Sequence, residues 1–139
     1  MIEIYLQSGF VTKKPIVALI LQSSRYRWLK AEQINQHVTN KQLDSLAAIY
    51  ALNHVRNKHR KKKVILYTNS EYLHQFLVKE GKEYKTALTS VKATANLRDI
   101  IDTFLDIKVA KLIQNDNTEE LIHVYKECGL DDIILNEKS

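Results

Sequence analysis

The sequence predicts an α/β domain built on a mixed five-stranded sheet, with three antiparallel strands, then two parallel strands, and about four flanking helices. Three β-rich segments follow one another closely at the N-terminus, which is typical of an antiparallel meander. Two later β-rich segments are separated by helical patterns, which favours parallel strands joined by crossovers. The predicted order is βββαβααβα. Because 139 residues with 45% hydrophobic content suit one domain, we expect residues 1–139 to form a single unit.

Five segments carry the strand signals. The segment IVALIL is apolar throughout, which indicates a buried strand. The segment RYRWLK is bulky, with its basic residues at the outward positions. The remaining three segments are short and rich in Ile, Val and Leu. In chain order, the predicted strands cover residues 2–6, 16–21, 25–30, 64–68 and 107–113.

The helices are predicted from end signals and from apolar spacing. The first begins with a capping box at Thr39 and Gln42 and runs to about residue 54. The second starts near Ser70, and the third carries an apolar stripe within 97–105 that repeats every three or four residues.

The last helix has predicted signals at both of its ends. It opens with a second capping-box pattern at Asn117 and Glu120, and an apolar stripe that includes Tyr125 follows. It ends at Gly129, because glycine is favoured directly after a helix.

Composition and charge narrow the possible function classes. One cysteine, Cys128, excludes an internal disulfide and a thiolate-rich zinc site. The absence of a signal peptide pattern or a membrane-length apolar run predicts a cytoplasmic protein. The net charge is +5, and six of the eight residues at 56–63 are basic. Such a run attracts polyanions such as nucleic acid, but the run by itself favours a solvated helix end, where cations are stabilised by the helix dipole.

Asp44 is the most informative single residue of the first predicted helix. Its same-face neighbours are Ala47, Ala48 and Ala51, so this face can lie close to the sheet. A carboxylate at the head of a packing face is costly unless a partner satisfies it. Two interpretations stay open. Asp44 lies in the first turn and is stabilised by the helix dipole, or it points at a polar cluster on the strand ends.

Several segments, taken in order, resemble the ribonuclease H family. Residues 39–52 are similar to the family's first helix, which reads T-N-N-x-x-E-L-x-A-x-x-x-A-L, and residues 64–73 are similar to its fourth strand, which ends T-D-S-x-Y. The opening at 2–9 resembles its first strand. The stretch at 85–97 resembles its K-T…V-K-N…L segment, and 119–121 resembles the D-x-L of its last helix.

The resemblance implies the family's site, in which four carboxylates hold two magnesium ions that hydrolyse the RNA strand of an RNA–DNA hybrid. The matching positions are Gln7, Asp44, Asn69 and Glu119, with Glu120 as a one-step alternative to Glu119. Two of the four family carboxylates are therefore neutral amides here. We expect no intact catalytic set, no bound metal and no cofactor.

The function predicted from this resemblance is a catalytically inactive ribonuclease H-like domain that binds an RNA–DNA hybrid or duplex RNA through a basic face. Asn40 and Lys41 stand where the family's T-N-N touches nucleic acid. The other candidate phosphate contacts are basic residues of two segments, namely Lys85, Lys92, Arg60, Lys61 and Lys62.

Two alternatives stay open. The first is a weak ribonuclease H endonuclease that uses Mg²⁺ or Mn²⁺ with Asp44, Glu119 and the amide oxygens. The second is a structural or protein-interaction module, in which the apolar residues 133–135 and the acidic residues around them dock on a partner protein. The same apolar residues can instead pack back on the sheet. None of these functions involves a membrane.

Overall fold

The computed structural model describes residues 1–59, 63–78, 99–101, 104 and 106–138, with side chains described for 1–55, 63–75, 99–101, 104 and 106–130. It confirms the predicted fold class and the order of its elements. The described strands and helices are, in chain order, β1 (Ile2–Val11), β2 (Lys14–Gln22), β3 (Arg27–Gln33), α1 (Asn40–His59), β4 (Lys63–Thr68), α2 (Glu71–Val78), β5 (Asp106–Lys111) and α5 (Asp116–Lys138).

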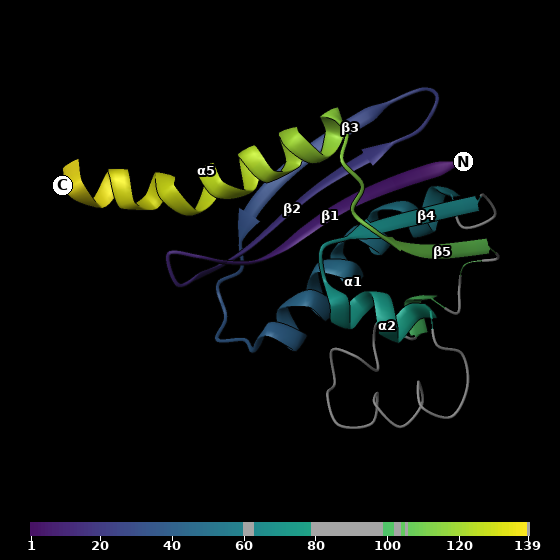
Figure 1. Ribbon diagram of the computed structural model, residues 1–139, viewed down its shortest axis with the longest axis horizontal. Helices are drawn as coiled ribbons and strands as arrows, with labels where there is room; N and C mark the ends of the chain where they lie inside the picture. Colours follow the sequence, from purple (N-terminus) through teal and green to yellow (C-terminus); the bar gives the residue numbers. More distant parts are fainter. Residues whose placement is uncertain (60–62, 79–98, 102–103, 105, 139) are drawn as a thin grey trace.

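The five strands form one mixed sheet in the spatial order β3-β2-β1-β4-β5 (Figure 1). Strands β1, β2 and β3 pair antiparallel, whereas β4 pairs parallel with both β1 and β5. The first two strands are longer than predicted, because the ladder between them continues beyond both apolar runs as far as the hairpin turn, where Val11 pairs with Lys14.

Helices cover both faces of the sheet, with α1 and α2 on one face and α5 on the other (Figure 1). The alternation of side chains along each strand decides which core a residue enters. Ile2, Ile4 and Leu6 of β1 pack with α1, while Tyr5 packs with α5. The apolar run 16–21 of β2 is buried throughout because its odd and even positions enter opposite cores.

The first helix begins as predicted. Thr39 donates its backbone N–H to Oε1 of Gln42 at 2.9 Å, and Gln42 donates its backbone N–H to Oγ1 of Thr39 at 3.2 Å. This reciprocal pair is a capping box. The helix continues to His59, five residues beyond the predicted end, so the first residues of the basic segment 56–63 are helical.

The capping box predicted for the last helix is wrong. The helix begins at Asp116, and Asn115 caps it by accepting the N–H of Thr118 at 2.9 Å. Asn117 instead accepts from Arg27 and donates to Gln22. Glu120 also binds Arg27, at 2.6 Å. The polar side chains that suggested a cap are therefore used to attach the start of α5 to β2 and β3.

The predicted end of the last helix at Gly129 is also wrong, because α5 continues to Lys138. Gly129 instead allows the backbone of α5 to approach β1 closely, since a Cβ at this position would overlap the side chain of Val11. The hydroxyl of Thr12 donates to the Gly129 carbonyl at 3.2 Å. The last residues of β1 therefore pack directly on the backbone of α5.

The second and third predicted helices are described to different extents. The second is α2, which begins directly after Ser70. The third, predicted at 97–105, lies largely outside the described residues, but Ile100 and Phe104 are buried in the core beside α1. No helix in the described ranges has the length and apolarity needed to cross a membrane.

The close packing at Gly129 leads to a stability prediction. Alanine normally stabilises a helix interior by about 1 kcal/mol relative to glycine. We expect Gly129→Ala instead to lower the free energy of unfolding by about 1–3 kcal/mol, because the new methyl group must displace Val11. Chemical denaturation measures this change, with Lys126→Ala on the exposed side of α5 as the control. A Gly129→Ala variant more stable than the parent would contradict the prediction.

Candidate functional site

Polar side chains meet beside α1, at the point where β4 ends and its pairing with β1 stops. The two strands are parallel neighbours, so their carboxyl ends lie at the same edge of the sheet. Ser8 comes from β1, and Asn69 and Ser70 directly follow β4. Asp44 reaches them from α1. We call these four residues the strand-end cluster.

Asp44 is the acceptor at the centre of the strand-end cluster. Its Oδ1 accepts the hydroxyl of Ser8 at 2.7 Å, and its Oδ2 accepts the hydroxyl of Ser70 at 2.6 Å. Both serines are buried and Asp44 is half-buried. The interpretation that Asp44 points at the strand ends is confirmed. The first-turn interpretation is wrong, because the first turn of α1 contains no acidic residue and Asp44 lies one turn later.

Ser70 connects Asp44 to the start of α2. The Oγ of Ser70 accepts the backbone N–H of Leu73 at 3.1 Å, which is an N-cap bond, while the same hydroxyl donates its proton to Asp44. The carboxylate charge is thereby placed next to the N-terminus of α2, where the helix dipole favours a negative group. The dipole of α2, rather than that of α1, therefore stabilises the negative charge of Asp44.

Asn69 is held by the backbone of Ser8. Its Oδ1 accepts the Ser8 N–H at 2.9 Å, and its Nδ2 donates to the Ser8 carbonyl at 2.8 Å. The amide side chain therefore extends the pairing of β4 with β1 beyond the end of the strand. An aspartate could accept the first bond but could not donate the second, because an ionised carboxylate carries no proton.

Gln7 points to the opposite side of β1 from Ser8, toward α5. There it lies near the hydroxyl of Tyr125, which packs against Gly9. Burial raises the pKa of Tyr125 above its ordinary value, the neighbouring Gln7 side chain partly offsets this rise, and the charge of Asp44 adds to it. Tyr125 was missed as a site residue because its place on the apolar stripe of the last helix indicated only a core position.

Glu119 lies apart from these contacts. It is exposed in the first turn of α5, where its backbone N–H bonds to the Asn115 carbonyl. Tyr125, which does reach Gln7, is six residues later and so about 9 Å farther along the helix axis. Among the described residues, no contact joins Glu119 to Gln7, Asp44 or Asn69, and its role stays a prediction.

The side chains of the cluster do not fit a pair of magnesium ions. Magnesium prefers several hard, anionic oxygen ligands. Asp44 is the single acid in the cluster, and both of its oxygens already accept hydroxyl protons. Throughout the described part of the chain, no group of three His, Cys, Asp or Glu side chains is arranged to hold a metal.

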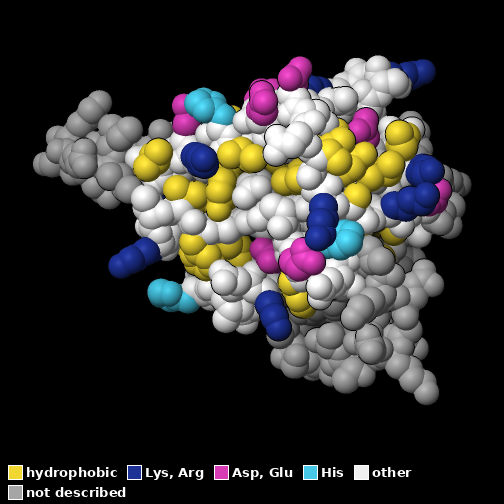
Figure 2. All heavy atoms as spheres, viewed as in Figure 1, with side chains coloured by type: hydrophobic (Ala, Val, Ile, Leu, Met, Phe, Trp, Pro, Cys, Tyr) yellow, Lys and Arg dark blue, Asp and Glu magenta, His cyan; other side chains and the backbone are white. Residues whose placement is uncertain are grey.

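The predicted nucleic-acid contacts are described only in part. Asn40 and Lys41 are exposed in the first turn of α1, and the Lys41 ammonium lies 5.6 Å from the ring centre of Tyr72 in α2. Figure 2 shows Lys and Arg side chains spaced apart on the face it presents, with acidic residues among them. Five further contacts lie outside the described residues, namely Lys85, Lys92, Arg60, Lys61 and Lys62.

Comparison with known proteins identifies the fold. The sequence matches no protein-family model and no curated protein. The structure is similar to ribonuclease H1 from the halophilic archaeon Halobacterium salinarum, with a TM-score of 0.67 and 17% identity over 94% of this chain and 98% of that one. It is similar to LC11 ribonuclease H1, solved in complex with an RNA/DNA hybrid, with a TM-score of 0.67 and 17% identity over 94% and 99% of the two chains.

A third similar structure is the N-terminal ribonuclease H domain of a Mycobacterium tuberculosis protein, with a TM-score of 0.67 and 10% identity over 95% of this chain and 97% of that one. Identities this low establish a shared fold rather than a shared activity. These neighbours match over nearly their whole length, and the topology is the one predicted from the sequence. The chain therefore has the ribonuclease H fold.

Proposed function

We propose that this domain is a catalytically inactive ribonuclease H-like module that binds an RNA–DNA hybrid or duplex RNA. One observation carries the proposal of inactivity. The carboxylate of Asp44 is shared between two buried serine hydroxyls of its own chain, and the family's two other strand positions carry the neutral amides Gln7 and Asn69.

The chemistry of hydrolysis explains why this arrangement argues against an enzyme. A two-metal mechanism requires ligands that hold two dications beside a phosphodiester, so that one ion activates water and the other stabilises the leaving oxygen. An amide oxygen can bind a cation but supplies no negative charge. The Asn69 oxygen is also engaged by the Ser8 N–H. Changes in residues that merely support metal ligands typically cost about 10- to 100-fold, and loss of ligand charge should cost more.

Three features support nucleic-acid binding. The chain carries a net charge of +5, and a structural neighbour was solved with an RNA/DNA hybrid. The first turn of α1 presents exposed Asn40 and Lys41 at a helix N-terminus, where backbone N–H groups and the helix dipole favour phosphate. A-form-like duplexes are recognised mainly by groove shape and 2′-hydroxyl groups, which suits an amide beside a cation.

The first prediction concerns binding. We expect affinity for a fluorescent RNA–DNA hybrid, measured by anisotropy, to fall steeply between 50 and 200 mM salt, by about tenfold or more. Lys41→Ala should weaken binding several-fold and reduce the salt slope by about one. Lys108→Ala, an exposed lysine on β5, serves as the matched control. A salt-independent affinity, or an equal loss of affinity in both variants, would contradict the proposed interface.

The second prediction concerns metal. We expect no cleavage of the hybrid with Mg²⁺ or Mn²⁺, and no rise in melting temperature at 10 mM Mg²⁺. A site with a dissociation constant near 1 mM would add about 1.4 kcal/mol at that concentration. Asp44→Ala should destabilise the domain by about 1–3 kcal/mol, with or without metal, because the Ser8 and Ser70 hydroxyls lose their acceptor. Metal-dependent cleavage that disappears in Asp44→Ala would instead establish an enzyme.

A further inference from the structure

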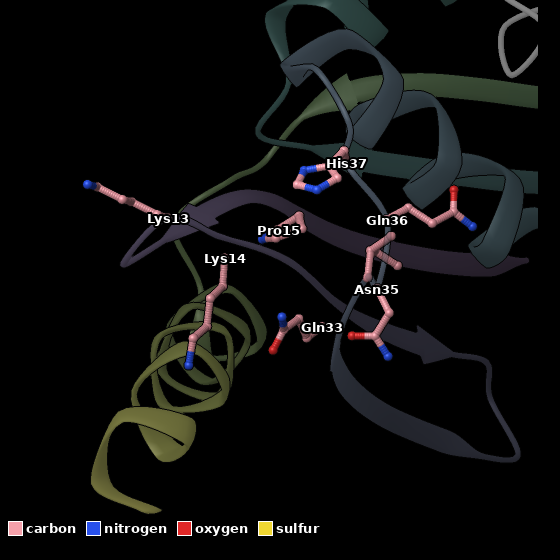
Figure 3. Close-up of a pocket in the computed structure, with 8 residues that line it drawn as sticks. Lys13, Lys14, Pro15, Gln33, Asn35, Gln36 and His37 are labelled. Atoms are coloured by element: carbon pink, nitrogen blue, oxygen red, sulfur yellow. The ribbon is translucent and has the colours of Figure 1, made fainter. Parts of the chain in front are cut away.

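A pocket of about 330 Å³ lies between the turn that joins β1 to β2 and the linker that joins β3 to α1 (Figure 3). It lies at the end of the sheet toward which β1 runs, beyond Ser8, and it does not include the strand-end cluster. Most of its lining side chains are polar, namely Lys13, Lys14, Gln33, Asn35, Gln36 and His37.

The walls of the pocket are joined to one another by backbone bonds. The Ile34 N–H bonds to the Pro15 carbonyl at 2.9 Å, directly beyond the last β2–β3 pair, Ile16 with Gln33. The other wall is a two-residue turn in which Thr12 and Lys13 both adopt positive φ, at 51° and 68°, the geometry of a tight hairpin. The pocket is thus largely formed before any ligand arrives.

The charge of the lining favours an anion. Lys13 and Lys14 are cationic, and none of the described residues that line the pocket is acidic. In Figure 3, Lys13 extends outward from the hairpin, whereas Lys14 descends on the same side as Gln33, with His37 across from them. The Lys14 ammonium nitrogen is buried. Lys13 is exposed, so its long side chain can swing to a phosphate at the rim at little cost.

The neutral side chains of the lining indicate which chemical group of the ligand is attached to the anion. Gln33, Asn35 and Gln36 each offer a donor and an acceptor on one amide, the combination that pairs with the edges of nucleobases. Pro15 and Ile34 add apolar surface against which a ring can lie. The volume is at the small end of the range for ligand pockets, about 300–1,000 Å³, which suits one nucleotide better than a large cofactor.

We propose that this pocket binds a single nucleotide through its phosphate and its base. The nucleotide is either a free nucleoside monophosphate or the phosphorylated end of a nucleic-acid strand. The lining of this pocket does not include Asn40 or Lys41, so the test of this proposal does not depend on hybrid binding.

Titration calorimetry with AMP, adenosine and inorganic phosphate tests the proposal. We expect AMP to bind at least about tenfold more tightly than either fragment, because only AMP uses both the cationic and the amide groups. Lys13→Ala and Gln33→Ala should each weaken AMP binding about three- to tenfold, while Lys108→Ala, at an exposed lysine of β5, leaves it unchanged. Equal affinity for AMP and phosphate, no AMP binding, or the same loss in the control variant would overturn the proposal.

Two further measurements locate and identify the ligand. Amide chemical shifts should move on AMP addition at residues 13–15 and 33–37, and shifts confined to other segments would overturn the assignment. A 5′-phosphorylated dinucleotide and its unphosphorylated form distinguish the two sources of the nucleotide. Tighter binding of the phosphorylated dinucleotide than of AMP identifies a strand end as the ligand. The reverse order identifies a free mononucleotide, and failure of both to bind would overturn the proposal.

Discussion

The carboxylate of Asp44 joins three elements of this fold. Through Ser8 it fixes α1 to the end of β1, and through Ser70 it fixes α1 to the start of α2. The serines are buried, so each hydroxyl needs a partner inside the protein, and one carboxylate satisfies both. The close packing of Ala47, Ala48 and Ala51 against the sheet brings this part of α1 near enough for those bonds to form.

The same bonds underlie the hydrolytic inactivity that we propose for this end of the sheet. Oxygens that accept hydroxyl protons from their own chain are poorly placed to neutralise two dications. Asn69 is committed in the same way, because its amide completes the pairing of β4 with the Ser8 backbone. With carboxylates at these positions, the same set of groups could support hydrolysis. With the side chains present here, it stabilises the geometry of the strand ends. This reasoning supports the proposal that the cluster is structural and that nucleic acid contacts exposed residues outside it.

The opposite face of the sheet depends on the close approach of α5. Gly129 lets the helix backbone contact Val11, and Gly9 makes room for the Tyr125 ring. These two contacts align α5 along β1, which brings Tyr125 rather than Glu119 to Gln7. The polar residues Asn117 and Glu120 at the start of the helix are attached elsewhere, since both bind Arg27.

The sequence alone determined the sheet, the order of its elements and the capping box at Thr39, because local periodicity and short motifs carry that information. It left Asp44 open between the helix dipole and the strand ends, and the bonds to Ser8 and Ser70 decided for the strand ends. The partners of Asn117, Glu120 and Gly129 lie on β1, β2 and β3, far away in sequence, so their local patterns suggested helix ends that the structure does not have. The position of Tyr125 could not be predicted for the same reason. Its spacing indicated a buried aromatic residue, and only the packing of α5 across β1 placed its hydroxyl beside Gln7. Tertiary structure decided these points because each depends on which side chains from distant segments meet.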